Sequence, residues 1–416
     1  MTIRNESRPV AVFGSHWGAT LAFVGSLGRR QVPIHVYGAG AVRWSRYCVR
    51  RARCPDANDA DRFLPWLEAR VRSGEIARLA PTTDVIAYYL ACVREHFPPE
   101  VQRAITPLAE IETLLIKSRF AVACGGIGQP APRSTAPRSV DEAVDAAERL
   151  GFPVILKPNS HLVVGFAERG HLLHDADDVR RNFRRYTVAD GHDALASRYP
   201  ELIWPLLQRF VPSARGGVLS VSGFKDVDGG LVAAMLSCKV EQWPPDTGVS
   251  TAQVNCFDPL VLRAGMDAVD RLVSRGIFEL ELLQDGEELV AIDLNPRAFG
   301  FMNLNIALGH DLPWSWFQST IGPVPPMRSE RLEDGPRIHC VSTVPSLAGR
   351  CVGALFGVNG NPHYRPQAAA IETVPMIGVR HDPIPLVIAN FVQLRHAGRL
   401  LRPYLKAARL ARQMAA

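Results

Sequence analysis

The sequence has no Cys-x-x-Cys pair and no cysteine–histidine cluster at zinc-site spacing. Its eight cysteines are scattered along 416 residues, as in a cytosolic protein with reduced thiols. Long hydrophobic runs are also absent, and no uncharged apolar stretch reaches transmembrane length. The first residues, Met1 to Glu6, carry an acidic residue in place of an apolar signal segment. We therefore expect a cytoplasmic globular protein of two or three domains.

Acidic residues are missing from the C-terminal tail. Residues 385–416 contain six basic side chains and no Asp or Glu, and these six account for the whole net charge of +6. They are Arg395, Arg399, Arg402, Lys406, Arg409 and Arg412. A charge confined to one end does not make a nucleic-acid surface, so no nucleic-acid partner is expected. The helical spacing favours a solvated helix packed on the body over peripheral contact with an anionic membrane.

The N-terminal third alternates strands and helices. Apolar strands are predicted over residues 10–14 and 32–37, with a helix over residues 18–30, which is typical of a parallel sheet. The first strand-to-helix turn lacks a complete Gly-x-Gly-x-x-Gly motif, so a nicotinamide dehydrogenase is disfavoured. The loop at residues 80–84 follows a strand end, where such sheets often bind substrate. Capping of the next helix by Thr83 or Asp84 is the alternative.

Two lysines mark the central region. Lys157 ends the apolar strand 152–158, and Lys117 stands earlier, at the entrance to the region. A buried ammonium needs solvent or a partner, and two convergent lysines would neutralise phosphates. Between them, Ser139-x-x-Glu142 is a capping box that predicts a helix ending at Gly151.

Further strands follow. An apolar strand is predicted over residues 206–212, where it ends at a proline, and its backbone groups could face the edge of an adenine ring. Two further strands are predicted over 217–224 and 231–240, on either side of an Asp-Gly-Gly turn. Lys239 belongs to the second of these. A loop over 243–250 and a helix over 259–275 complete the region.

Two apolar runs, residues 277–283 and 288–294, flank a Gln-Asp-Gly-Glu turn and predict a β-hairpin. Glu281 and Asp293 would then face each other, and Asn295 would share the face of Asp293 because side chains alternate along a strand. Carboxylate and amide oxygens are the ligands that Mg2+ prefers, and a triphosphate can complete the coordination. Arg297, next to them, is placed to hold a phosphoryl or carboxylate oxygen. The alternative is a solvated hairpin face without a ligand.

Taken in order, these segments resemble the ATP-grasp superfamily over residues 9–325. The resemblance implies an α/β (α+β) fold with an N-terminal parallel-sheet domain, a small nucleotide lobe and a central antiparallel catalytic lobe. We place the N-terminal pre-ATP-grasp domain at residues 1–114, the nucleotide lobe at 115–212 and the catalytic lobe at 213–330. A C-terminal extension with basic helices would occupy residues 331–416.

The resemblance also implies roles for single residues, with ATP and Mg2+ as cofactors. ATP would be held by Lys117 and Lys157 at the phosphates and by Gln208, Arg209, Phe210 and Val211 at the adenine. Magnesium would be held by Glu281, Asp293 and Asn295. Arg297 would act at the reacting carbonyl, and Lys239 would bind the substrate carboxylate. Asp84, His16 and His161 are weak candidates for a general base.

Three further segments resemble a narrower group, the predicted carboxylate-amine ligases similar to D-aspartate ligase. They are residues 44–48, residues 80–84 and the Pro-Pro-x-x-Gly-x-Ser segment that begins at Pro244. This implies a ligase that joins a small-molecule carboxylate and an amine through an acyl phosphate, releasing ADP and phosphate. The substrates and the oligomeric state stay open.

Two departures from the family pattern leave a second interpretation. The loop 159–167 contains one glycine where the family has several, and Arg209 replaces an acidic residue of the adenine hinge. Both features favour, as the alternative, a degenerate ATP-grasp protein that binds nucleotide or metabolite without turnover.

Overall fold

The structure is a computed structural model that describes residues 8–15, 18–163, 169–188, 194–214, 217–243, 248–327, 337–356 and 370–395. Four features of the sequence interpretation lie wholly or partly outside these ranges. They are His16, residues 164–168 of the glycine-poor loop, residues 244–247 of the Pro-Pro segment, and the basic tail beyond Arg395.

The N-terminal region forms a parallel sheet, as predicted. Its strands are β1 (Val10–Phe13), β2 (Ile34–Tyr37) and β3 (Cys48–Ala52), with helix α2 (Gly18–Arg29) between the first two. Leu79 pairs in parallel with Ala11 on the free side of β1. Because carboxyl ends of parallel strands share one edge, this pairing brings the 80–84 loop beside the ends of β1 and β2.

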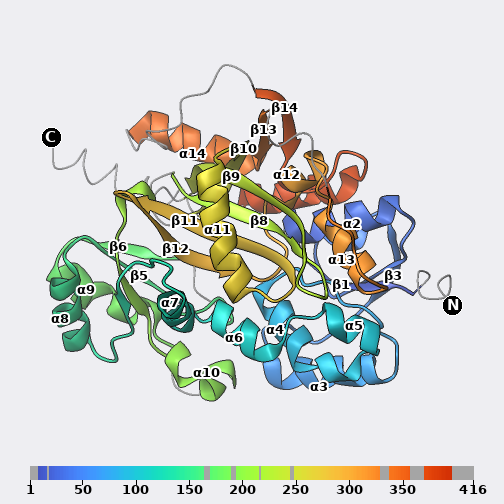
Figure 1. Cartoon of the computed structure of the whole chain (residues 1–416), viewed down its shortest axis with the longest axis horizontal. Helices are drawn as coiled ribbons and strands as arrows, with labels where there is room; N and C mark the ends of the chain where they lie inside the picture. Colours follow the sequence, from blue (N-terminus) through green and yellow to red (C-terminus); the bar gives the residue numbers. More distant parts are fainter. Residues whose placement is uncertain are drawn as a thin grey trace.

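Helices then lead from this sheet to the small lobe. They are α3 (Ala60–Arg72), α4 (Asp84–Cys92), α5 (Pro99–Ala104), α6 (Leu108–Leu115) and α7 (Lys117–Gly126). Short 3-10 turns occur at Ala41–Trp44, Arg94–His96, Phe183–Tyr186, Pro200–Leu202 and Pro212–Ala214. In Figure 1, α7 and α6 run from the small lobe on the left to the N-terminal helices on the right.

The small lobe contains a four-stranded antiparallel sheet in the order β4-β7-β5-β6. The strands are β4 (Ser134–Thr135), β7 (Leu206–Arg209), β5 (Val154–Lys157) and β6 (His171–Leu173), with helices α8 (Val140–Leu150), α9 (Ala176–Asn182) and α10 (Ala194–Arg198). The predicted capping of α8 is confirmed: Ser139 accepts a hydrogen bond from the Glu142 amide, and Gly151 follows the last turn with φ 82°. The Glu142 carboxylate accepts from the Arg138 amide, one residue before the expected position.

The predicted catalytic lobe contributes to a seven-stranded sheet in the order β12-β11-β8-β9-β10-β13-β14. Its strands are β8 (Leu219–Lys225), β9 (Leu231–Trp243), β10 (Val249–Cys256), β11 (Gly276–Asp285), β12 (Glu288–Asn295), β13 (Arg337–Val341) and β14 (Ala370–Pro375). The predicted hairpin is confirmed, because β11 and β12 pair antiparallel with Glu281 opposite Asp293. Residue Glu279 pairs with Asn295, so four polar side chains share one face of the hairpin.

The helices of this region are α11 (Pro259–Leu272), α12 (Met302–Ala307), α13 (Leu312–Ser319) and α14 (Thr343–Phe356). Strands β13 and β14 come from the predicted C-terminal extension but continue the catalytic sheet beside β10. The limits of the four predicted parts stay a prediction. Within the described ranges, no helix is both long and apolar enough to cross a lipid bilayer.

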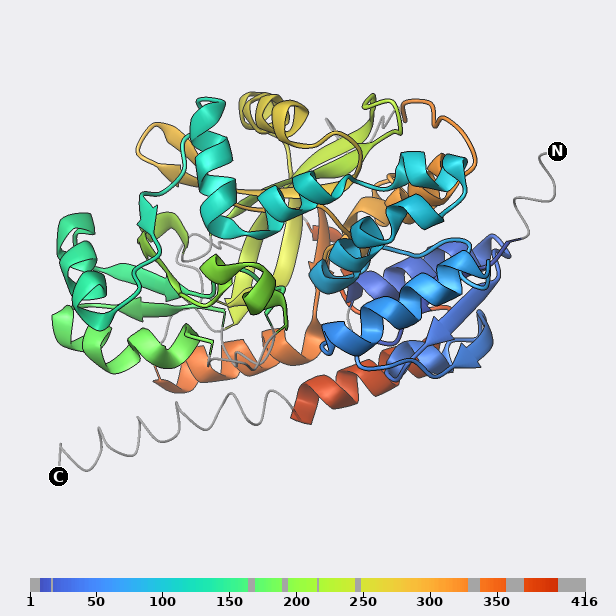
Figure 2. The ribbon, with the colours of Figure 1, turned by 90° about the horizontal axis from the view of Figure 1, so that it is seen from below.

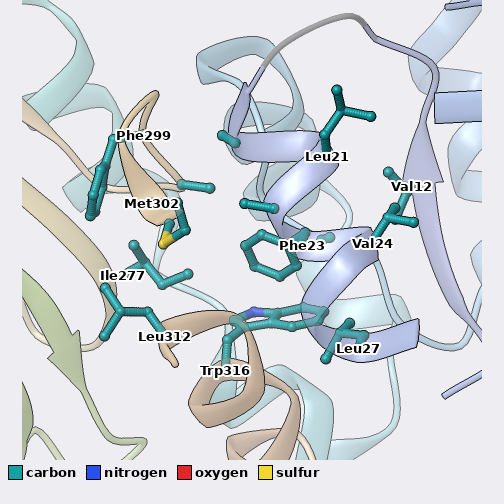
Figure 3. Close-up of a cluster of buried hydrophobic side chains, with 14 of the residues drawn as sticks. Val12, Leu21, Phe23, Val24, Leu27, Ile277, Phe299, Met302, Leu312 and Trp316 are labelled. Carbon is teal, nitrogen blue, oxygen red and sulfur yellow. The ribbon is translucent and has the colours of Figure 1, made fainter. Parts of the chain in front are cut away.

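One hydrophobic core joins the N-terminal sheet to the catalytic sheet. Phe23 of α2 lies against Trp316 of α13, with their ring centroids 5.4 Å apart. Figure 3 shows α2 side chains meeting Ile277 of β11 together with residues of α12 and α13. The relative position of the two sheets is therefore set by close packing. Protein interiors are packed so densely that even small shifts are costly.

The other face of β11 carries a separate core. Leu280, between Glu279 and Glu281, is fully buried under α11 and α7. Leu280→Ala should lower the free energy of unfolding by about 2–5 kcal/mol, because it leaves a cavity. Urea denaturation measures this change. The matched control Leu260→Ala, at a position 75% exposed, should stay within about 0.5 kcal/mol of the native chain. Equal stability of the two variants would contradict this packing.

Candidate active site

A cavity lies between the four-stranded and seven-stranded sheets, and its wall includes every predicted site residue. These are Lys117, Lys157, Gln208, Arg209, Phe210, Val211, Lys239, Glu281, Asp293, Asn295 and Arg297. The structure thus brings together side chains from β5, β7, β9, β11 and β12. Their individual roles stay predictions.

The side chains of β11 that line the cavity change from apolar to acidic along the strand. Leu283, near the turn, is apolar and lines the cavity with Ile155 and Ile292, whereas Glu281 and then Glu279 follow on the same face. The cavity wall is therefore apolar near the hairpin turn and charged toward the end of β12. This arrangement suits a molecule with a flat apolar end and an anionic end.

The two predicted carboxylate ligands each face a lysine. Lys117 donates to Asp293 at 2.6 Å, and Lys239 donates to Glu281 at 3.4 Å. Both lysines are nearly buried. Burial by itself would raise the pKa of Asp293, but the Lys117 ammonium outweighs it and holds that pKa below its usual range. Both carboxylates are thus paired with cations supplied by the protein.

A third acid, Glu279, was not identified from the sequence. Its carboxylate accepts from Ser220 and from the Asn295 amide, each at 3.1 Å. Burial, followed by repulsion from Glu281, raises the pKa of Glu279 to about 8. Glu279 lies two residues before Glu281 in the same apolar run. This spacing indicates that both side chains lie on one face of the strand, and it could have identified Glu279.

Arg297 is held by an acid of the N-terminal domain. Its Nε and Nη2 donate to the two oxygens of Asp84 at 2.8 and 3.1 Å, and Nη2 also donates to Asn295. Nη1 donates to the Ala298 carbonyl, so one of the five N–H groups has no partner among the described residues and is available to a substrate oxygen. Thr83 caps α4, as the alternative interpretation of this loop allowed, which leaves Asp84 to pair with Arg297.

The small lobe contributes a lysine that is not fully charged near neutral pH. Lys157 donates to Gln208 Oε1 at 2.9 Å, so the Gln208 side chain holds this lysine. Burial, and then the neighbouring Lys117, lower the pKa of Lys157 to about 7. A phosphate would reverse this shift, because an adjacent anion favours the ammonium form.

Arg209 contacts the β11–β12 hairpin through its side chain. Its guanidinium forms an ion pair with Asp285, at the turn of the β11–β12 hairpin. The arginine that stands in place of an acid therefore links the small lobe to the catalytic hairpin. The neighbouring backbone of Phe210 and Val211 still lines the cavity.

Two of the candidate bases fit poorly. Burial lowers the pKa of His161 to about 3, with Lys117 and Arg169 adding to the effect, so this imidazole is a very weak base. The pKa of Asp84 is also lowered, because the Arg297 pair outweighs the opposing effect of burial. Neither group has a pKa near neutral pH, which general-base catalysis favours.

A second cavity adjoins the first on the side of the N-terminal sheet. Its wall contains Gly14 and Gly38 from the carboxyl ends of β1 and β2, together with Thr82. His161 and Arg169 line both cavities. The Thr82 hydroxyl is buried and has no hydrogen-bond partner among the described residues. A buried hydroxyl without a partner is costly, so this position is suited to a polar ligand atom.

The donor set fits a magnesium ion only in part. In the described portion of the chain, no three His, Cys, Asp or Glu side chains gather as a metal site. The hairpin supplies two carboxylates and one amide oxygen, so phosphate or water oxygens would have to complete six-fold coordination. This is the usual arrangement for magnesium bound together with a nucleotide.

No family model matches the sequence, but curated proteins do. The C-terminal section of the carbamoyl phosphate synthase large chain of Methanopyrus kandleri is 25% identical over 203 residues, 45% of this chain and 34% of that protein. The carbamoyl phosphate synthase large chain of Thermus thermophilus is 24% identical over 302 residues, 66% of this chain and 27% of that protein. The chain therefore spans about a third or less of these relatives.

Solved structures share the fold across most of the chain. Biotin carboxylase from Campylobacter jejuni, in a β,γ-ATP complex, has a TM-score of 0.60 at 12% identity and covers 78% of this chain and 73% of its own. L-amino acid ligase from Bacillus licheniformis has a TM-score of 0.56 at 11% identity, with 77% and 75% covered. The sequence similarity and the shared fold support the predicted resemblance to the ATP-grasp superfamily. The predicted fold class is likewise confirmed.

A further structural neighbour was solved with bound ligands. The biotin carboxylase domain of 2-oxoglutarate carboxylase from Hydrogenobacter thermophilus has a TM-score of 0.59 at 14% identity and covers 77% of this chain and 70% of its own. That domain was solved with MgADP, ADP and bicarbonate.

The Asp84–Arg297 pair can be tested by measuring the stability of variants. Asp84→Asn should lower the free energy of unfolding by about 3–5 kcal/mol, because it leaves a buried guanidinium without its counter-ion. The control is Asp228→Asn, whose partner Arg103 and own side chain are both more than half exposed; it should cost less than about 1 kcal/mol. Urea denaturation measures both. Similar losses would contradict burial of the Asp84–Arg297 pair.

Lys157 gives a pH test. Because its folded pKa is about 7, below the ordinary value near 10.4, the unfolded chain binds more protons at this lysine between those values. The native chain should therefore gain stability relative to Lys157→Met as pH rises above about 7. Urea denaturation at several pH values measures the difference. A difference that does not change with pH would contradict the lowered pKa.

Proposed function

We propose that this protein is an ATP-grasp enzyme, an ATP- and Mg2+-dependent carboxylate-amine ligase. The observation that carries the proposal is the cavity in which Lys117, Lys157, Lys239 and Arg297 meet three acids and an amide. The apolar stretch of the same cavity suits adenine, and the cations suit a polyphosphate. The relatives support ATP-dependent ligation in general.

The reaction would proceed in two steps. A substrate carboxylate oxygen attacks the γ-phosphorus of ATP, forming an acyl phosphate and releasing ADP. The lone pair of a neutral amine then attacks the acyl carbon, the C–O bond to phosphate breaks, and amide, phosphate and a proton are released. No covalent bond to the protein is required.

Each protein group has a task that its position suggests. Lys117 would exchange Asp293 for phosphate oxygens, and Lys157 would gain its proton beside them. Arg297, fixed by Asp84, would direct its open N–H to an oxygen of the reacting carboxyl group, a preorganised electrostatic role. Lys239 would bind the substrate carboxylate. Magnesium, when bound, would neutralise phosphate charge at Glu281, Asp293 and Asn295.

The second cavity is where we place the body of a substrate. It lies at the carboxyl ends of the N-terminal strands and shares Arg169 with the nucleotide cavity. The Thr82 hydroxyl would hydrogen-bond a polar atom of that substrate. The resemblance to ligases similar to D-aspartate ligase, and the fold shared with an L-amino acid ligase, make amino acids the first compounds to test.

Ligation predicts that ADP release needs both an acid and an amine. With a pool of amino acids, Asp293→Ala and Asn295→Ala should each lower the rate by about a hundredfold or more, because Mg2+ and the γ-phosphate lose their support. The control Asp267→Ala removes an exposed acid on α11 and should leave the rate unchanged. A coupled ADP assay measures the rates.

Two outcomes separate the rival interpretations. Nucleotide binding without ADP release under any pair of substrates would favour the degenerate binder. ADP release that persists in both hairpin variants would contradict the assignment of the metal site.

A further inference from the structure

The helix over residues 383–395 has an apolar outer side. Four of its side chains are between 57% and 66% exposed: Ile384, Val387, Phe391 and Leu394. Their spacing of three and four residues places them in one stripe along the helix, which we name the docking stripe. On the opposite side Ala389 is fully buried in the main core. The outer side of a solvated surface helix is normally polar, whereas the outer side of this helix is apolar.

The helix is fixed to the body at two points. Asp382, just before it, accepts hydrogen bonds from the Ser45 hydroxyl and the Arg46 amide. Three turns further along, Gln393 accepts from the Ser342 hydroxyl. In Figure 2 this red helix lies on the outside of the molecule, against the N-terminal segment. The docking stripe is therefore held on a positioned element.

The surroundings of the stripe combine basic and aromatic side chains. Trp44 is 60% exposed and precedes Ser45, which binds the residue before the helix. Three exposed arginines lie near the helix. The amide of Arg46 binds the residue before the helix, Arg380 lies three residues before it in sequence, and Arg395 is its last described residue. Asp382, the residue before the helix, is buried and accepts a hydrogen bond from Ser45. From residue 383 to residue 416 the sequence has six basic side chains and no acidic one.

The combination of apolar, aromatic and basic side chains fits a membrane surface better than it fits a second copy of the chain. An exposed apolar stripe with tryptophan and arginines at its border is the pattern of a helix that lies in the interface of an anionic membrane. A second copy of the chain fits less well, because two such surfaces would bring like charges together. We propose that the docking stripe inserts into the surface of an anionic lipid membrane. The nucleotide cavity would then lie near the membrane, since Gln393 also lines it.

Vesicle sedimentation of the full chain tests the proposal. The chain should sediment with vesicles that contain phosphatidylglycerol, remain in the supernatant with phosphatidylcholine alone, and be released by added salt. The double variant Phe391→Ser, Leu394→Ser should bind phosphatidylglycerol vesicles at least about tenfold more weakly, because it removes apolar insertion. A matched control is Val122→Ser, Leu260→Ser, at positions 76% and 75% exposed on other helices; it should bind like the native chain.

Three results would overturn the proposal. The chain could stay in the supernatant with anionic vesicles while its thermal unfolding shows it to be folded. The stripe variant could bind as well as the control, which would assign binding to charge alone. Light scattering without lipid could show a dimer that the stripe variant dissociates, which would assign the stripe to a second copy.

Discussion

The arrangement of this site depends on two buried ion pairs at the end of β12. Lys117–Asp293 ties the first residue of α7 to the catalytic hairpin, and Asp84–Arg297 ties the N-terminal domain to the same five-residue segment. Buried pairs add little net stability, because desolvation offsets most of their attraction. They do fix positions, since a displaced partner would leave a buried charge alone. The segment from Asp293 to Arg297 is thus the point at which three parts of the chain are aligned.

Within the site, the charges of the basic side chains are balanced by acidic side chains of the protein. Four cations, Lys117, Lys157, Lys239 and Arg297, stand with four acids, Asp84, Glu279, Glu281 and Asp293. Lys157 and Glu279 both have pKa values shifted toward their neutral forms, which lowers the cost of burial. A ligand that brought only anions would leave the acids unpaired once the lysines turned to it. A polyphosphate together with a divalent cation can satisfy both sets of groups, and this is the physical reason for the proposed cofactors.

Local signals in the sequence predicted local structure well. The Asp-Gly turn with alternating apolar residues specified the hairpin and the Glu281–Asp293 pairing, and the Ser139 cap specified the start of α8. The convergence of Lys117, Lys157 and Asp293 followed from the order of motifs. Contacts between distant segments could not be read in this way. The Asp84–Arg297 pair spans 213 residues, the Arg209–Asp285 pair joins two lobes, and the addition of β13 and β14 to the catalytic sheet has no local signature.

We propose that Asp293 exchanges Lys117 for a magnesium–nucleotide complex. Calorimetric titration with a non-hydrolysable ATP analogue, with and without Mg2+, measures this exchange in the native chain and in Asp293→Asn. We expect tight binding that needs Mg2+ in the native chain, and loss of the magnesium dependence in the variant. Binding that is unchanged by Mg2+ in the native chain, or equally dependent on it in the variant, would contradict this exchange.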